Sequence, residues 1–182
     1  MLIKFKNHSP KLGQNVFVAE GAKIIGEIEI GDESSIWFNC VLRADVNFIK
    51  IGKRTNIQDL STVHVWHREF DEKGKLKDAG FPTIIGDDVT IGHNCVIHAC
   101  VIKNRVLIGM NAVIMDNALI EEDSIVGAGS VVTKGKKFPP RSLILGNPAK
   151  FVRELNDEEV SFLKQSALNY VDFKNEFLKD LQ

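Results

Sequence analysis

Three histidines, His64, His93 and His98, are the side chains in this sequence whose type and spacing best fit chemistry at one centre. A neutral imidazole is a common zinc ligand. Three protein ligands with a fourth position open to water are typical of catalytic rather than structural zinc sites. The histidines therefore indicate a catalytic metal site, provided that the fold brings them together.

A six-residue repeat determines where these side chains lie. Neither the helical period of 3.6 residues nor the strand period of 2 explains a sustained period of six. Six residues can form one short strand and a turn, so three repeats close a triangular coil and successive coils stack into a parallel β-helix. The repeated aliphatic positions are Ile24, Ile30, Ile36, Leu42, Ile51, Ile57, Val63, Ile85, Ile91, Ile97, Ile102, Ile108, Ile114, Ile120, Val126 and Val132.

The other repeat positions predict how each coil is built. The aliphatic side chain should point inward, and the glycine that often follows it should permit the corner. Four residues after the aliphatic position the side chain is small or β-branched, so Cys40, Val46 and Cys95 are expected to fit beside the next rung. We interpret Cys40 and Cys95 as core residues rather than reactive thiols.

The all-β repeat predicts a β-helix domain over residues 1–153 and a separate helix over residues 154–182. Residues 65–84 interrupt the repeat with charges and a proline, and are expected to leave the coil as a loop excursion. Asn156, followed by three acidic residues, is typical of a helix N-terminus. Apolar residues at roughly helical spacing up to Leu181 predict that this helix packs along the outside of the coil.

Counting repeats places two of the histidines on one face. We number the three faces by the repeats that Ile51, Ile57 and Val63 open, as faces one, two and three. If the excursion preserves the phase, His64 and His98 both follow the aliphatic residue of face three and stack about 4.8 Å apart, the spacing of neighbouring strands. His93 lies on face two and cannot easily complete their site. A neighbouring copy packed around a threefold axis could bring its own His93 against this pair.

The same counting places charged residues one rung below the histidines. Arg43 lies on face three below His64, and Asp59 lies on face two below His93, with Gln58 beside it. Buried or interfacial charges must be paired, so an Arg43–Asp59 ion pair across the subunit boundary is expected. Asp45 is a second candidate partner for Arg43.

These motifs resemble the γ-class carbonic anhydrase family over nearly the whole chain. The resemblance is carried by Arg43-Ala44-Asp45, the run from Asn56 to Asp59, Val63-His64, the spacing from His93 to His98, and the ending Ile144–Arg153. The resemblance implies a left-handed β-helix and a homotrimer with three interfacial zinc sites, in which iron or cobalt can replace zinc. The substrates would be carbon dioxide and bicarbonate.

The resemblance also implies roles for individual residues. Gln58 matches the residue that orients the attacking hydroxide, and Arg43 and Asp59 match the interface pair. Tyr170 resembles a C-terminal tyrosine that lies near the metal in some members, although helix packing would also explain it.

The sequence departs from the family pattern where protons are moved. A glutamate is common after the arginine–aspartate motif, but Val46 stands there. His67 lies three residues past His64 and is a candidate proton carrier, because an imidazole exchanges protons near neutral pH. The alternative reading is a solvated loop residue, in which case the protons would pass through water or Glu69.

Two other functions remain open on the same repeat. An acyltransferase would use acyl-CoA and one histidine base, and would leave two histidines unexplained. A trimer could also bind metal without rapid catalysis and serve as a scaffold. Measuring the metal content distinguishes an acyltransferase from a carbonic anhydrase. A carbon dioxide hydration assay distinguishes a non-catalytic scaffold from a carbonic anhydrase.

Composition limits the partners. The chain has 182 residues and a formal net charge of −1, so nothing in its charge favours nucleic acid or a membrane surface. An odd number of cysteines, three, fits a reducing compartment better than a disulfide framework. The sequence contains no apolar run long enough for a signal peptide or a membrane span, and a cytoplasmic protein is expected.

Overall fold

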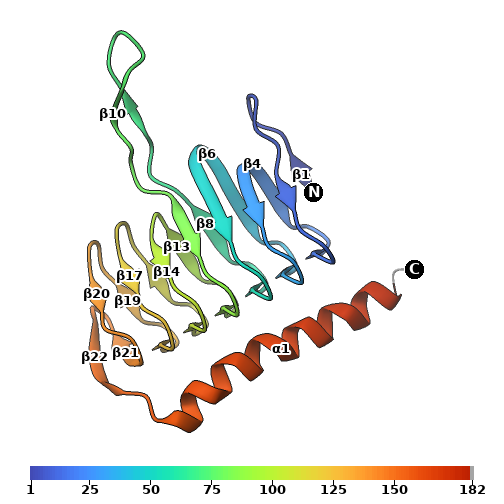
Figure 1. Cartoon of the computed structure of the whole chain (residues 1–182), viewed down its shortest axis with the longest axis vertical. Helices are drawn as coiled ribbons and strands as arrows, with labels where there is room; N and C mark the ends of the chain where they lie inside the picture. The colour runs from blue at the N-terminus through green and yellow to red at the C-terminus, as the bar shows by residue number, and fades with distance from the viewer. Residues whose placement is uncertain (181–182) are drawn as a thin grey trace.

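The computed structural model describes residues 1–180, and the chain forms the predicted left-handed parallel β-helix with one C-terminal helix (Figure 1). Consecutive coils stack, so strands far apart in sequence pair in parallel. One face of the coil is an eight-stranded sheet. Its strands are β3 (Phe17–Val18), β5 (Ser35–Ile36), β7 (Asn56–Ile57), β12 (Thr90–Ile91), β15 (Leu107–Ile108), β18 (Ile125–Val126), β21 (Ser142–Gly146) and β22 (Ala149–Glu154), of which β21 and β22 pair antiparallel.

The other two faces belong to a twelve-stranded sheet. It is continuous because β4 and β6 are long enough to run through both faces. Its strands are β1 (Leu2–Ile3), β2 (Lys11–Leu12), β4 (Lys23–Ile30), β6 (Val41–Ile51), β8 (Thr62–His64), β11 (Thr83–Ile85), β13 (Val96–His98), β14 (Val101–Ile102), β16 (Val113–Ile114), β17 (Leu119–Ile120), β19 (Val131–Val132) and β20 (Lys137–Phe138).

The excursion preserves the phase of the repeat. Strand β11 pairs with β6, β12 pairs with β7, and β13 pairs with β8. Ile97 is the partner of Val63, and His98 is the partner of His64. The register expected on face three is therefore confirmed.

The aliphatic positions form the core of the coil. All sixteen are buried and belong to one continuous hydrophobic cluster. The cysteines at small positions, Cys40 and Cys95, are buried there as expected, and burial raises the pKa of each thiol to about 11. Cys100 is buried too, and burial raises its pKa further. None of the three is in a disulfide.

The role expected for the glycines was wrong. The left-handed corners fall on other residues, among them Asn94 and Asn111, with φ angles of 56° and 59°. Asparagine tolerates this conformation better than most residues. The glycines instead permit close stacking, because a Cβ atom on Gly109 would lie 2.4 Å from the backbone nitrogen of Ala128 in the next coil.

Val46 does not occupy a small core position either. Its exposed fraction is 41%, because β6 continues outward from Val41 to Ile51 as one long strand before the repeat resumes. The neighbouring side chain of Asn47 is buried and donates hydrogen bonds to the carbonyl oxygens of Trp66 and Ala79, at 3.0 and 2.9 Å. This part of β6 therefore anchors the base of the excursion.

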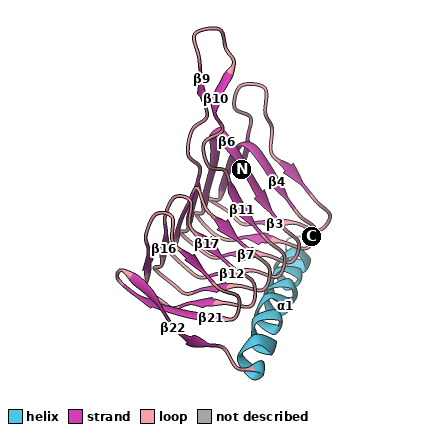
Figure 2. Ribbon diagram, turned by 60° about the vertical axis from the view of Figure 1, so that its left-hand side comes forward, coloured by secondary structure: helices cyan, strands magenta, loops and turns pink. Residues whose placement is uncertain are grey.

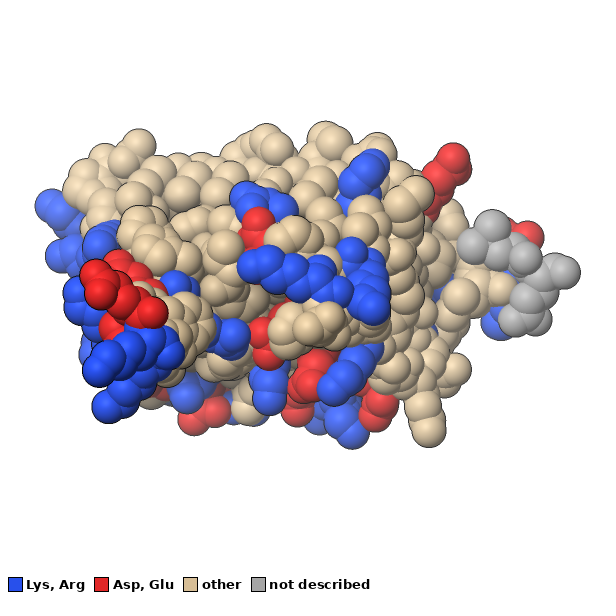
Figure 3. All heavy atoms as spheres, turned by 90° about the horizontal axis from the view of Figure 1, so that it is seen from above, with Lys and Arg blue, Asp and Glu red and all other residues tan. Residues whose placement is uncertain are grey.

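The excursion stands away from the coil as a hairpin of β9 (Glu69–Phe70) and β10 (Leu76–Asp78) (Figures 1 and 2). On the face seen in Figure 3, acidic side chains are interspersed among basic ones. No helix within residues 1–180 is long and apolar enough to cross a membrane.

The C-terminal helix α1 (Asp157–Asp180) runs along the outside of the coil (Figure 2). It begins with the predicted capping arrangement: Asn156 Oδ1 accepts from the Glu159 backbone nitrogen, and Glu159 Oε2 accepts from that of Asn156. Its inner face buries Leu163 and Ala167. Leu181, part of the predicted apolar pattern, lies outside the described residues, and the division into two domains stays a prediction.

A fully buried lysine also joins the helix to the coil. Lys174 has no exposed surface, and its ammonium group donates a 2.7 Å hydrogen bond to the Glu33 carboxylate. Beside this contact, Trp37 packs edge-on against Tyr170 and Phe177, with ring centroids 5.6 and 5.3 Å apart. The helix is thus fixed over the N-terminal coils on face two.

Candidate metal centre

His64 and His98 face each other across one rung of the β-helix. They end the paired strands β8 and β13, and their Cα atoms are register partners. His64 Nδ1 lies 3.1 Å from His98 Nε2. Two nitrogens bound at 2.0–2.1 Å to one tetrahedral zinc ion lie about 3.3 Å apart. The separation of these two nitrogens therefore fits two ligands of a single ion.

The outer nitrogen of each ring is held by a carboxylate. His64 Nε2 lies 3.1 Å from Asp45 Oδ1, and His98 Nδ1 is hydrogen-bonded to Asp116 Oδ1. An ionised carboxylate can only accept, so each outer nitrogen carries a proton, and in a neutral ring the inner nitrogen keeps its lone pair. The lone pairs of His64 Nδ1 and His98 Nε2 are the groups that a cation would bind.

Electrostatics favour the neutral, metal-binding form of His64. Partial burial lowers the pKa of His64, and the hydrogen bond to Asp45 opposes this without cancelling it. Partial burial would raise the pKa of Asp45, but hydrogen bonds from His64 and Arg43 outweigh it and hold that pKa below its ordinary value. At neutral pH the pair is thus a neutral imidazole beside a carboxylate.

His93 lies on another face, as the register predicted. It follows β12 in the eight-stranded sheet, whereas His64 and His98 belong to the twelve-stranded sheet. His93 Nδ1 lies 2.7 Å from Asp59 Oδ2, and its side chain is 47% exposed. The Asp59 carboxylate is itself fixed, because its Oδ1 accepts from the backbone nitrogen of Phe38 at 3.1 Å. His93 Nε2 is the nitrogen left to bind a metal.

One chain alone does not complete a three-ligand site. Among residues 1–180 there is no group of three His, Cys, Asp or Glu side chains placed to hold one metal ion. The His64–His98 pair and His93 are two separate parts of such a site. A three-histidine centre would need His93 from a second copy.

The charged residues expected at a subunit boundary have partners within the chain. Arg43 is paired with Asp45, the second candidate partner, which also contacts His64. Asp59 is paired with His93. The single chain thus shows Asp45 and Asp59 orienting histidines, while an Arg43–Asp59 contact between subunits stays a prediction.

Gln58 is held by a chain of hydrogen bonds that ends on helix α1. Its Nε2 donates to Asn56 Oδ1 at 3.1 Å, and Asn56 Nδ2 donates to Thr90 Oγ1 at 3.0 Å. Thr90 Oγ1 lies 3.2 Å from Ser166 Oγ on the helix. The Gln58 side chain is buried, and its Oε1 is the atom left to accept a hydrogen bond from a ligand.

Tyr170 lies between two cavities that share His93. One, of about 250 Å³, includes Asp59 and Trp37, and the other, of about 200 Å³, includes Gln58. Burial raises the pKa of Tyr170, and the nearby Asp59 carboxylate adds to the effect. Tyr170 therefore remains a phenol at neutral pH, and it combines packing on Trp37 with a position beside His93.

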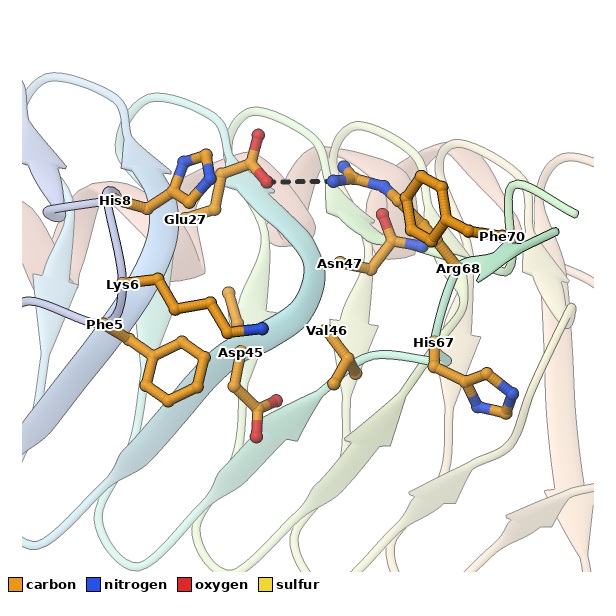
Figure 4. A pocket seen from close by; sticks show the side chains of 11 residues that line it. Phe5, Lys6, His8, Glu27, Asp45, Val46, Asn47, His67, Arg68 and Phe70 are labelled. Carbon is orange, nitrogen blue, oxygen red and sulfur yellow. Dashed lines mark hydrogen bonds and ion pairs between the residues drawn. The ribbon is translucent and has the colours of Figure 1, made fainter. Parts of the chain in front are cut away.

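His67 lies on the excursion and lines a separate cavity of about 330 Å³ with Asp45 and Val46 (Figure 4). Its ring is 48% exposed, turned away from Asp45, and 3.5 Å from Glu69 Oε1. The ring also packs on Trp66, at a centroid distance of 5.0 Å, and Trp66 in turn meets His98 edge-on at 6.4 Å. His67 is thus exposed and adjoins the histidine pair through the indole of Trp66.

Asp116 is the contact that sequence reasoning missed. It lies two residues after the aliphatic Ile114, at the face-three position equivalent to that of Asp59 after Ile57 on face two. Counting two residues on from the aliphatic residue of the rung above His98 would have identified Asp116. Thr90 and Ser166 carry no comparable signal, because the contact between them depends on where the helix packs.

The fold and site define a hexapeptide-repeat protein with histidines on two faces of the coil. Comparisons with known proteins agree with the repeat fold. A family model described as Dynactin subunit 5 matches residues 12–175. The probable carbonic anhydrase of Methanocaldococcus jannaschii is 48% identical over 88% of this chain and 93% of its own length. The carbonic anhydrase of Geobacillus kaustophilus is 40% identical over 100% of this chain and 93% of its own.

Solved structures agree on the fold. A Bacillus cereus protein named as an acetyltransferase is 40% identical with a TM-score of 0.89, covering 100% of this chain and 98% of that one. A hexapeptide transferase family protein from Anaplasma phagocytophilum is 39% identical with a TM-score of 0.88, covering 97% and 98%. The chain belongs to the γ-class carbonic anhydrase family of hexapeptide-repeat proteins. It spans 59% of the length of two Arabidopsis thaliana relatives named gamma carbonic anhydrases.

Proposed function

We propose that this chain forms a homotrimer that reversibly hydrates carbon dioxide to bicarbonate at metal sites shared between subunits. Each site takes His64 and His98 from one chain and His93 from its neighbour. The observation that carries the proposal is the 3.1 Å separation of His64 Nδ1 and His98 Nε2 on one face, with the third histidine on another face and partly exposed. The relatives named carbonic anhydrases support the activity.

Zinc is the metal proposed, and iron or cobalt can replace it. Imidazole ligands suit all three metals. When bound, such a metal acts as a Lewis acid and makes water ionise near neutral pH. The protein holds the ligands: Asp45, Asp59 and Asp116 each fix the proton of one imidazole on the nitrogen that points away from the metal position.

Gln58 is proposed to orient the attacking oxygen. Its amide nitrogen donates a hydrogen bond to Asn56 Oδ1, which fixes the amide group. Its Oε1 can then accept a hydrogen bond from the nucleophile and so direct the lone pair of the attacking oxygen. Tyr170, beside His93, is proposed to line the space that the substrate enters. His67, which is exposed and packs on the Trp66 ring beside His98, is proposed to carry the released proton to solvent.

Trimer formation has independent support from exposed apolar side chains. Val96 lies two residues before His98, and Met110 and Met115 lie one coil beyond His93 and His98 at the matching repeat positions. Their exposed fractions are 42%, 50% and 37%. Apolar surface of this kind around a site is typical of a protein interface. In the trimer Arg43 would meet Asp59 of a neighbour. The three free, buried cysteines fit a cytoplasmic protein.

The direct test measures three properties of the same purified protein: its mass in solution, its metal content, and the rate of carbon dioxide hydration by stopped flow. We expect a trimer with one metal per chain and hydration that disappears in His64→Ala. His8→Ala is the matched control for assembly and metal binding, because His8 lies outside the repeat and should change neither the mass in solution nor the metal content. A metal-loaded trimer without hydration above the buffer rate would favour a metal-binding scaffold.

An acyltransferase is the second candidate, and the Bacillus cereus structure named as an acetyltransferase favours it. That reaction needs one histidine base and no metal. Transfer of an acetyl group from acetyl-CoA by metal-free protein would support this function. Loss of all activity on metal removal would exclude it.

A further inference from the structure

We propose that Asp116 is a positioning residue of this metal centre, which holds His98 so that Nε2 faces the ion. The inference rests on the proposed function, because it requires that His98 binds a metal. It adds a residue that none of the motifs or comparisons identifies. Asp116 touches neither the proposed metal position nor the substrate cavities, and acts only through the imidazole of His98.

The evidence is the contact and the rigidity of its surroundings. Asp116 follows β16, which pairs with β13 so that Ile114 lies against Ile97. Its side chain is only 15% exposed, and its carboxylate accepts from His98 Nδ1. Its backbone oxygen accepts from the Gly135 nitrogen of the next coil at 2.8 Å. The carboxylate is therefore held by the β-helix itself rather than by a mobile loop.

The contact matters because the two histidines on this face are held through different ring nitrogens. His64 is held at Nε2 and presents Nδ1, whereas His98 is held at Nδ1 and presents Nε2. Without Asp116, either nitrogen of His98 could carry the proton and the ring could rotate. A metal would then have to select the tautomer and orient the ring as it binds. Loss of such an outer contact typically weakens metal binding about 10- to 100-fold.

Asp123 provides a matched control. Its side chain is 18% exposed, close to the 15% of Asp116, and its Oδ1 accepts from Arg105 Nε at 2.6 Å. It therefore makes a partly shielded ion pair on the same β-helix but contacts no histidine ligand. Removing it tests the general effect of losing a coil carboxylate.

The experiment compares the assembled parent protein with Asp116→Ala, Asp116→Asn and Asp123→Ala. Cobalt(II) affinity is measured by competition with a chelator, the cobalt absorption spectrum reports the ligand geometry, and the melting temperature of the metal-free protein reports the fold. We expect Asp116→Ala to bind cobalt about 10- to 100-fold more weakly with an altered spectrum. Asp116→Asn, which keeps a neutral acceptor, should fall between, and Asp123→Ala should bind as the parent does.

The outcomes separate the inference from the proposed function. If the parent binds cobalt and Asp116→Ala matches it in affinity and spectrum, Asp116 does not position His98 and the inference is wrong. A lower melting temperature of Asp116→Ala with unchanged affinity would also overturn it, because the contact would then be structural only. If the parent itself binds no cobalt, the proposed function fails, and this inference fails with it.

Discussion

The Nδ1 atom of His64 lies 3.1 Å from the Nε2 atom of His98, and the remaining nitrogen of each ring contacts an aspartate. The proton on each ring is therefore kept away from the gap between them. Two of the three proposed ligands are thus ordered within each chain. His93, the proposed third ligand, is ordered separately by Asp59 on another face.

Replacing any of the three histidines should remove metal without unfolding the coil. His64→Ala, His93→Ala and His98→Ala each delete one proposed ligand, and all three side chains lie outside the hydrophobic core. Metal content measured by mass spectrometry and hydration should both fall to background, while the far-ultraviolet circular dichroism spectrum stays that of the parent. Full metal content in His93→Ala would contradict the proposed ligand set.

Arg43→Ala should weaken the trimer more than it weakens the chain. Within the chain, the Arg43 side chain is 46% exposed, so its pair with Asp45 contributes about 0–1 kcal/mol to the free energy of unfolding. In a trimer a neighbour would cover this pair. Removing Arg43 would then leave a buried carboxylate without a partner, which costs about 3–5 kcal/mol of trimer stability. Sedimentation on dilution should show dissociation at higher concentration than for the parent.

The control for this prediction is Arg105→Ala, which removes an arginine of similar exposure paired with Asp123 elsewhere on the coil. It should leave the trimer dissociation constant unchanged. Equal dissociation of Arg43→Ala and the parent would show that Arg43 does not pair across the boundary.

His67→Ala should lower turnover in dilute buffer while leaving metal content unchanged. The exposed His67 ring packs on Trp66, which separates it from His98, so its proposed role is transport of protons rather than metal binding. Imidazole added to the assay should restore much of the lost rate, because a free base can replace a missing proton carrier but cannot repair a metal site. If turnover is unaffected at every buffer concentration, the proton route runs through water or Glu69.

Glu33→Gln should destabilise the packing of helix α1. The fully buried Lys174 would lose the carboxylate that neutralises it, and stranding a charged donor costs about 1–3 kcal/mol. Urea unfolding measures this loss, and Glu33→Gln combined with Lys174→Met should recover part of it. Glu29→Gln, which removes a carboxylate from exposed pairs with Lys11 and Lys50, is the control and should change little.

The same pair predicts a pH dependence. The hydrogen bond from Lys174 lowers the pKa of Glu33 below its ordinary 4.5. A group with a lowered folded pKa stabilises the protein above its unfolded pKa, and this contribution is lost as the pH falls through the folded pKa. The difference in stability between the parent and Glu33→Gln should therefore be present at neutral pH and shrink below about pH 4. A difference that stays constant down to pH 2 would show that the carboxylate charge is not responsible.

The coil and the stacking of two histidines could be predicted from the sequence because both depend on counting. Most aliphatic core residues follow one another at steps of six, and a phase preserved across the excursion places His98 over His64. The helix start at Asn156 was equally readable, because its capping contacts are local. Periodic and local signals are the ones that a single sequence carries directly.

Contacts between the helix and the coil could not be predicted from periodic or local sequence signals. Lys174 falls on the buried side of the helix, but a sequence pattern assigns a lysine to solvent, and only the position of Glu33 explains its burial. The link from Thr90 to Ser166 likewise depends on how the helix lies on the coil. The sequence pattern places the corners at the glycines after the aliphatic residues, because glycine is usually taken to supply conformational freedom. In the structure these glycines instead make room for the next coil.

The most direct test of the shared site is to mix two inactive variants. His93→Ala chains keep His64 and His98, and His98→Ala chains keep His93, so each variant alone should bind no metal. After joint refolding, a shared site predicts one intact site of three in every mixed trimer. Since about three quarters of randomly assembled trimers are mixed, metal content and hydration should recover to about one quarter of the parent values. No recovery in mixtures shown to contain mixed trimers would contradict the shared site.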